Sequence, residues 1–167
     1  MDKNKLKIEF DLGLKNAELI YDTVIMTWGV SHYRYAKGSK NNFKSIEGFF
    51  KEVMLSPKGL EGSIGTTEPW SIRTNFENFV NGLILKESDE SSLNNWLSDS
   101  IKEAKEYEKD WKDETEMEID SIVIPSNHEV VTEIKETNEP RFYINTYTGF
   151  LSENKFEYFF FESQFES

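Results

Sequence analysis

Hydrophobic and polar residues alternate with a period of two near the N-terminal end of the chain. Leu6, Ile8 and Phe10 are separated by charged residues, which is the pattern of a half-buried strand. The run over 19–28 is rich in β-branched and aromatic residues and stops at a glycine. These patterns predict two strands, with a third, short strand over 30–35.

The middle of the chain has helical spacing instead. Ser45 is a suitable N-cap for a helix whose apolar residues fall on one face before Pro57. A second helix is predicted over 76–84, where five apolar residues recur at intervals of three and one. Ser92 is expected to open a third helix, whose apolar stripe includes Trp96 and runs to Trp111.

The period returns to two after residue 116 and predicts four strands. They are Met117–Ile124, Glu129–Lys135, Arg141–Thr148 and Phe156–Glu162. Their connectors are short and consist of turn residues, which suits antiparallel neighbours because a parallel crossover needs a dozen or more residues. We therefore expect one α+β domain over 1–167. An antiparallel sheet is formed by the N-terminal strands and a C-terminal four-strand meander, with about three central helices packed on one face.

The last predicted strand contains three consecutive phenylalanines, Phe159–Phe161. Such a run is apolar on both faces of a strand, so it predicts a central strand or a strand packed at an interface. If the chain itself leaves one of these faces uncovered, a homodimer is expected.

The net charge of -12 is distributed very unevenly. Residues 1–60 carry 10 basic and 7 acidic side chains, a net charge of +3, whereas residues 61–167 carry 9 and 24, a net charge of -15. The densest segment, 87–120, holds 13 acidic and 4 basic side chains. Its negative field repels nucleic acid and attracts basic partners, so we expect a basic protein partner and no direct nucleic-acid binding.

Several classes of site and location are excluded or disfavoured. The chain has no cysteine, only two histidines, and no zinc, nucleotide or nucleophile-elbow motif, so no metal, cofactor or catalytic residue is expected. The N-terminus lacks the apolar region of a signal peptide, and no stretch approaches the roughly 18 apolar residues of a membrane span. A cytoplasmic protein without membrane contact is the expectation.

Carboxylates on the third predicted helix form the main candidate surface. Several of them are spaced by four residues and would share one helix face, while Trp96 and Trp111 are expected to face the core. Such a row could imitate the phosphates of nucleic acid or cover the basic cleft of an enzyme that acts on it. The residues predicted to bind the partner are Asp99, Glu103, Glu106, Asp110, Asp113 and Glu114.

A second cluster combines aromatic and basic residues. Its members are Trp28, His32, Tyr33, Arg34 and Tyr35. Aromatic side chains beside a guanidinium can stack on a ligand or anchor an interface. The structural alternative is a strand with both tyrosines inward and Arg34 outward, followed by a basic loop that attracts the acidic helix.

The predicted function is that of a small acidic interaction protein, not an enzyme. It would bind and neutralise a basic partner, and its composition is similar to that of immunity proteins and phage-type inhibitors of nucleic-acid-acting toxins or defence enzymes. One alternative is a small-ligand-binding domain with an aromatic-lined pocket in the strands. A further alternative is an enzyme whose carboxylate and tyrosine site is assembled only by folding.

Overall fold

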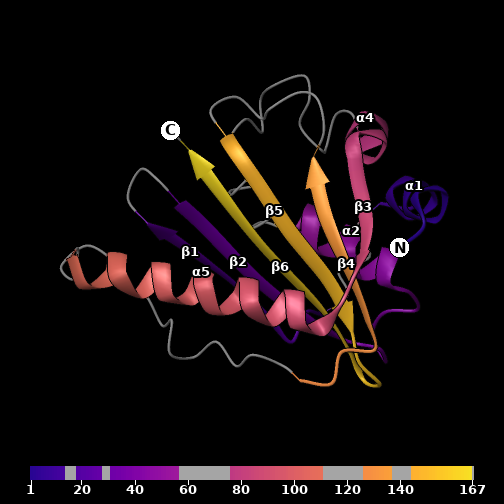
Figure 1. The fold of residues 1–167 in the computed structure, drawn as a ribbon. Coiled ribbons are helices and arrows are strands. Elements are labelled where there is room, and N and C mark those ends of the chain that lie inside the picture. Colours follow the sequence, from indigo (N-terminus) through magenta and orange to yellow (C-terminus); the bar gives the residue numbers. More distant parts are fainter. Residues whose placement is uncertain (14–17, 28–30, 57–75, 111–125, 137–143, 167) are drawn as a thin grey trace.

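The computed structural model describes residues 1–13, 18–27, 31–56, 76–110, 126–136 and 144–166. Its centre is a six-stranded antiparallel sheet with the order β1-β2-β6-β5-β4-β3 (Figure 1). The helices are α1 (Lys3–Asp11), α2 (Ile46–Leu55), α4 (Phe76–Gly82) and α5 (Glu90–Asp110). The strands are β1 (Tyr21–Thr27), β2 (Ser31–Ser39), β3 (Leu83–Ser88), β4 (Val130–Glu136), β5 (Ile144–Glu153) and β6 (Glu157–Glu166).

The three phenylalanines of β6 lie in the interior of the sheet and are almost completely buried. Phe160 belongs to one hydrophobic core, and Phe159 and Phe161 belong to a second core on the other side. Successive side chains of a strand point to opposite faces, so β6 contributes to both cores at once. The prediction of a central strand is confirmed, and the chain itself covers both faces of this run.

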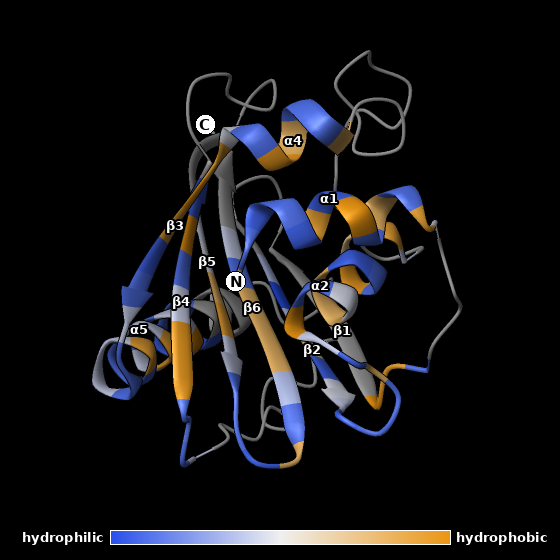
Figure 2. Ribbon diagram, turned by 90° about the vertical axis from the view of Figure 1, so that its right-hand side faces the viewer, coloured by the Kyte–Doolittle hydropathy of each residue, from blue (hydrophilic) through white to orange (hydrophobic). Residues whose placement is uncertain are grey.

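Helices cover both faces of the sheet, contrary to the expectation of one covered face. Figure 2 shows α1, α2 and α4 on one side and α5 on the other. Phe50 of α2 packs on Phe160, with 5.5 Å between ring centroids. Leu93 and Leu97 of α5 belong instead to the core of Phe159 and Phe161. The α+β class and the antiparallel sheet built from both ends of the chain are confirmed.

The first predicted strand is in fact helix α1. Leu6 and Phe10 are four residues apart, so one helix face buries both, while Ile8 between them is 60% exposed. Asp2 caps the helix, because its carboxylate accepts hydrogen bonds from the N–H groups of Asn4 and Lys5 at 2.7 and 3.1 Å. The alternation of apolar and charged residues was compatible with both periods, because Leu6 and Phe10 are also spaced for one face of a helix.

The remaining N-terminal and central predictions agree with the structure in most places. The strands β1 and β2 and the helix α2 are confirmed, and Ser45 caps α2 as predicted. The second predicted helix stops at Gly82, so Leu83 and Ile84 lie in β3, a strand that the pattern did not indicate. The third predicted helix is α5, which begins at Glu90, two residues before Ser92.

Three of the four C-terminal strands are found as consecutive antiparallel neighbours. The prediction over 129–135 corresponds to β4 and that over 156–162 to β6, while 144–148 of the third prediction lies in β5. The other predicted strand, 117–124, lies outside the described residues. On the far side of β4 the sheet ends with β3.

Truncation of a core residue of β6 should destabilise the protein strongly. Phe160→Ala is expected to lower the free energy of unfolding by about 3–5 kcal/mol, because the cavity lies between α2 and the sheet. Phe156→Ala removes the same atoms from a ring that is 66% exposed and should change stability by no more than about 0.5 kcal/mol. Urea unfolding measures both, and equal effects would contradict the assignment of Phe160 to the core.

Candidate functional site

Helix α5 carries the main candidate surface and is anchored by one apolar side. It crosses the sheet and contacts β4 and β1 (Figure 1). Leu93 and Leu97 are buried, and the Trp96 ring lies 5.1 Å from that of Phe150. The prediction that Trp96 faces the core is confirmed, whereas Trp111 lies outside the described residues.

Two carboxylates accept backbone hydrogen bonds at the start of α5, one from the helix itself and one from the segment that precedes β4. Asp89 accepts a hydrogen bond from the N–H of Ser92 at 2.7 Å, and this bond holds the pKa of Asp89 below its usual range. The Glu90 carboxylate accepts hydrogen bonds from the N–H groups of Asn127 and His128 at 2.7 and 3.3 Å. Negative groups at this end also interact favourably with the helix dipole. The helix therefore has a defined start on the sheet.

The outward side of α5 exposes three of the predicted carboxylates. Asp99, Glu103 and Glu106 are all exposed and are spaced by four and three residues, so they share one helix face. Lys102 and Lys105 are exposed as well, so this described surface is a mixture of three carboxylates and two ammonium groups.

The other predicted partner-binding residues continue beyond this surface. Asp110 is the last residue of α5, and Asp113 and Glu114 lie outside the described residues. Residues 87–110 carry 8 acidic and 3 basic side chains, and 111–120 carry 5 and 1. Residues 111–120, which come after α5 in the sequence, therefore carry -4 of the net charge of -9 of the 87–120 segment.

The second predicted cluster is dispersed by the fold. Tyr33, Arg34 and Tyr35 are buried in β2, and Tyr35 stacks on Phe161 with 4.9 Å between ring centroids. His32 lies in the same strand, paired with Met26 and Gln164, and Trp28 lies outside the described residues. Because successive residues of a strand face opposite ways, Arg34 and the two tyrosines point to opposite faces of the sheet.

Arg34 is 3% exposed, so the expectation that it points outward is wrong. Its Nη2 donates hydrogen bonds to the Val53 carbonyl at 2.7 Å and to Ser56 Oγ at 2.8 Å, at the C-terminal end of α2. A cation at this end satisfies helix carbonyls and matches the helix dipole. Glu162 of β6 lies directly opposite Arg34 in the strand register and is also buried.

Lys51 has a similar role at the end of α1. It is completely buried, and its Nζ donates to the Gly13 carbonyl at 2.7 Å and pairs with Glu52 at 2.6 Å. Gly13 has a positive φ of 68° and terminates α1. Nothing in the sequence pattern distinguished this lysine from a surface lysine, because its partners come from a distant turn and from its own helix.

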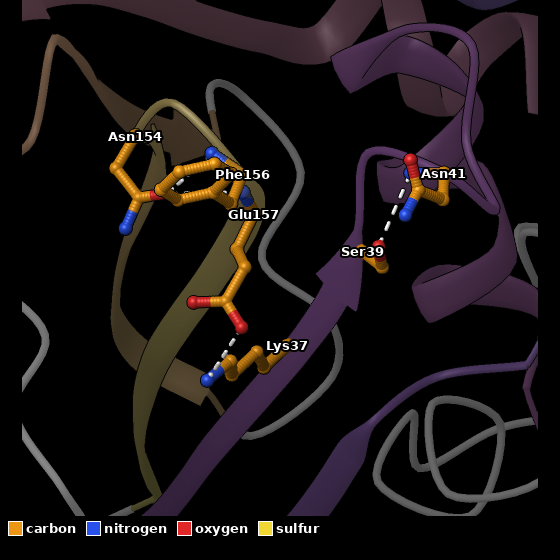
Figure 3. Close-up of polar contacts among 6 residues, drawn as sticks. All are labelled: Lys37, Ser39, Asn41, Asn154, Phe156 and Glu157. Atoms are coloured by element: carbon orange, nitrogen blue, oxygen red, sulfur yellow. Dashed lines mark hydrogen bonds and ion pairs between the residues drawn. The ribbon is translucent and has the colours of Figure 1, made fainter.

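Two lysines at the C-terminal end of β2, one inside the strand and one directly after it, pair with the β5–β6 hairpin. Lys37 Nζ lies 2.7 Å from the Glu157 carboxylate (Figure 3), and Lys40 Nζ lies 3.0 Å from that of Glu153. Asn154 fixes the hairpin turn by accepting hydrogen bonds from the N–H groups of Phe156 and Glu157, both at 2.9 Å (Figure 3). These two lysines therefore pair with carboxylates of the hairpin. The alternative interpretation of the sequence had expected the basic loop to attract the acidic helix instead.

The described residues bear on three other features, which are a metal site, a membrane span and an aromatic-lined pocket. These segments contain no group of three histidine, aspartate or glutamate side chains that could hold a metal ion. They also contain no helix with the length and apolar character required to cross a membrane. The aromatic residues Tyr158–Phe161, which an aromatic-lined pocket would have used, are buried in the two cores.

The cap of α5 gives a pH-dependent prediction. Because the folded pKa of Asp89 is lowered, its contribution to stability is present above the ordinary aspartate pKa of about 3.9 and is lost as the pH falls through the folded value. Asp89→Asn keeps an oxygen acceptor but does not titrate. The wild-type melting temperature should exceed that of this variant at neutral pH, and the difference should close in acid. A difference that persisted unchanged at acidic pH would contradict the assignment.

The comparisons with known proteins give no relative for this chain. No family model, no curated protein and no solved structure matches it.

Proposed function

We propose that this chain binds and neutralises a basic partner protein through the outward side of α5. The partner would be a toxin or defence enzyme that acts on nucleic acid, and the activity would lie in the cytoplasm. The observation that carries the proposal is the exposed row Asp99, Glu103 and Glu106 on a helix whose opposite side is anchored in a core.

The spacing of the row suits a positively charged groove. At about 1.5 Å per residue, Asp99 and Glu103 are separated by about 6 Å along the helix axis, and Glu103 and Glu106 by about 4.5 Å. An enzyme that binds nucleic acid must present positive charge to the phosphates. Carboxylates on a fixed helix would meet the same charges, and the long-range field would accelerate the encounter.

In the described part of the chain, the outward side of α5 is exposed at all three carboxylates, which supports the proposal. The exposed residues between the carboxylates are polar or charged, so the surface attracts by charge and not by apolar contact. The basic side chains Lys37 and Lys40, which could have neutralised the helix, pair with Glu157 and Glu153. The negative field of the 87–120 segment is therefore not cancelled by these two residues.

Charge reversal provides the test. We expect the triple variant Asp99→Lys, Glu103→Lys and Glu106→Lys to slow association with the partner by about tenfold or more at low salt, because electrostatic steering is reversed. The melting temperature should be nearly unchanged, since all three side chains are exposed. The partner is isolated by pull-down from the native host, with the product of the neighbouring gene included, and association is followed by stopped-flow fluorescence.

A matched control separates local from global charge. The double variant Glu18→Lys and Glu77→Lys is compared with the double variant Asp99→Lys and Glu103→Lys, because it changes the net charge by the same amount at exposed positions outside the 87–120 segment. The control variant should slow association much less than the α5 variant. If the two double variants behaved alike, or if association were insensitive to the α5 reversals and to salt, the proposed surface would be wrong.

A further inference from the structure

The side of α1 that faces away from the core is an exposed seam. Leu6 and Phe10 on the inner side are buried, whereas Ile8 and Leu12 are 60% and 57% exposed. The two exposed side chains are four residues apart and lie on one helix face. The whole seam consists of Asn4, Lys5, Ile8, Asp11 and Leu12, all of which are exposed.

The charges of this seam are complementary to themselves. Lys5 precedes Ile8 by three residues, and Asp11 follows it by three. When two copies of the helix lie antiparallel with Ile8 at the centre, Lys5 of each copy is therefore level with Asp11 of the other. Within the described part of the chain, neither Lys5 nor Asp11 takes part in an ion pair. As far as the described segments are concerned, both side chains can therefore pair with a second copy.

We propose that α1 pairs with α1 of a second copy, antiparallel about a two-fold axis near Ile8. In this arrangement Ile8 packs on the partner's Ile8, and Lys5 lies opposite the partner's Asp11 on both sides of the axis. Leu12 lies opposite the partner's Asn4. The same patch on both copies forms the contact, which is the isologous geometry of a two-fold dimer.

The charge distribution favours this face for self-association. Two copies with a net charge of -12 repel each other, but residues 1–60 carry a net charge of +3. The segment 2–11 is balanced, with three lysines and three carboxylates. Two copies can therefore approach through α1 without the like-charge repulsion that opposes contact through the acidic segment.

The dimer is compatible with the proposed binding surface. α1 and α5 lie on opposite faces of the sheet (Figure 2), so pairing through α1 leaves the outward side of α5 open. The contact is small, because a nine-residue helix is only about 14 Å long and buries less area than a standard interface. The dimer should therefore be weak, with a dissociation constant on the order of 100 µM.

Complementary charge variants provide the test. Sedimentation velocity of the whole chain, from about 10 µM to about 1 mM, should show a monomer–dimer equilibrium around the dissociation constant inferred above. Lys5→Asp places two carboxylates on each side of the axis, and Asp11→Lys places two ammonium groups there, so each variant alone should associate less than the wild type. An equimolar mixture of the two variants should associate again, because every pair is then of opposite charge.

Two further variants test the apolar centre of the seam. Ile8→Glu should weaken the dimer about tenfold or more, because it places two carboxylates on the axis and removes the buried contact. Ile84→Glu introduces the same change at a side chain of β3 that is 46% exposed and should leave the equilibrium unchanged. Circular dichroism checks that both variants are folded.

The proposal is overturned by any of three results. The first is a wild type that remains monomeric throughout the concentration range. The second is a mixture of charge variants that associates no more than its components do. The third is an Ile84→Glu variant whose association is weakened as much as that of Ile8→Glu. None of these results bears on α5, because association with the basic partner is measured separately.

Discussion

The fold depends on one constraint, which is that β6 must be covered on both faces. Phe159, Phe160 and Phe161 follow one another in a strand, so no single layer of helices can bury all three. The chain meets this constraint by placing β6 inside the sheet, with β2 and β5 as its neighbours. Helices α1, α2 and α4 then cover the face of Phe160, and α5 covers the other face. The isolation of α5 on its own face is what leaves its outward side exposed.

The charged residues follow the same division between interior and surface. Arg34 and Lys51 are buried, and each donates a hydrogen bond to a carbonyl at a helix end. Lys37 and Lys40 neutralise carboxylates of the β5–β6 hairpin. Several basic residues of the N-terminal segment are thus used within the fold, while the carboxylates on the outward side of α5 remain exposed.

The sequence pattern predicted those elements whose period was unambiguous. The β-branched run of β1 and the apolar face of α2 have only one reading, and both were predicted correctly. The first ten residues fit two periods, because Leu6, Ile8 and Phe10 alternate with charged residues, while Leu6 and Phe10 are also four residues apart. The strand was chosen wrongly. The short strand β3 follows α4 without a break and contains charged residues, so no local signal separated it from the helix.

The candidate site was predictable to a similar degree. The amphipathic pattern of α5 was sufficient to place Trp96 inward and Asp99 outward. It did not indicate which face of the sheet α5 covers, because an apolar stripe fits either core. The burial of Arg34 was missed for the same reason, since its acceptors Val53 and Ser56 come from a helix that only the tertiary fold brings to β2.

Amide hydrogen exchange of the whole chain tests the central role of β6 most directly. If β6 is the strand on which both cores depend, the amides of Phe159–Phe161 should exchange among the slowest in the protein, and those of the edge strand β3 should exchange much faster. The amides of α5 should also open without those of α2, because the two helices belong to different cores. Faster exchange in β6 than in β3, or a single opening shared by α2 and α5, would contradict this account.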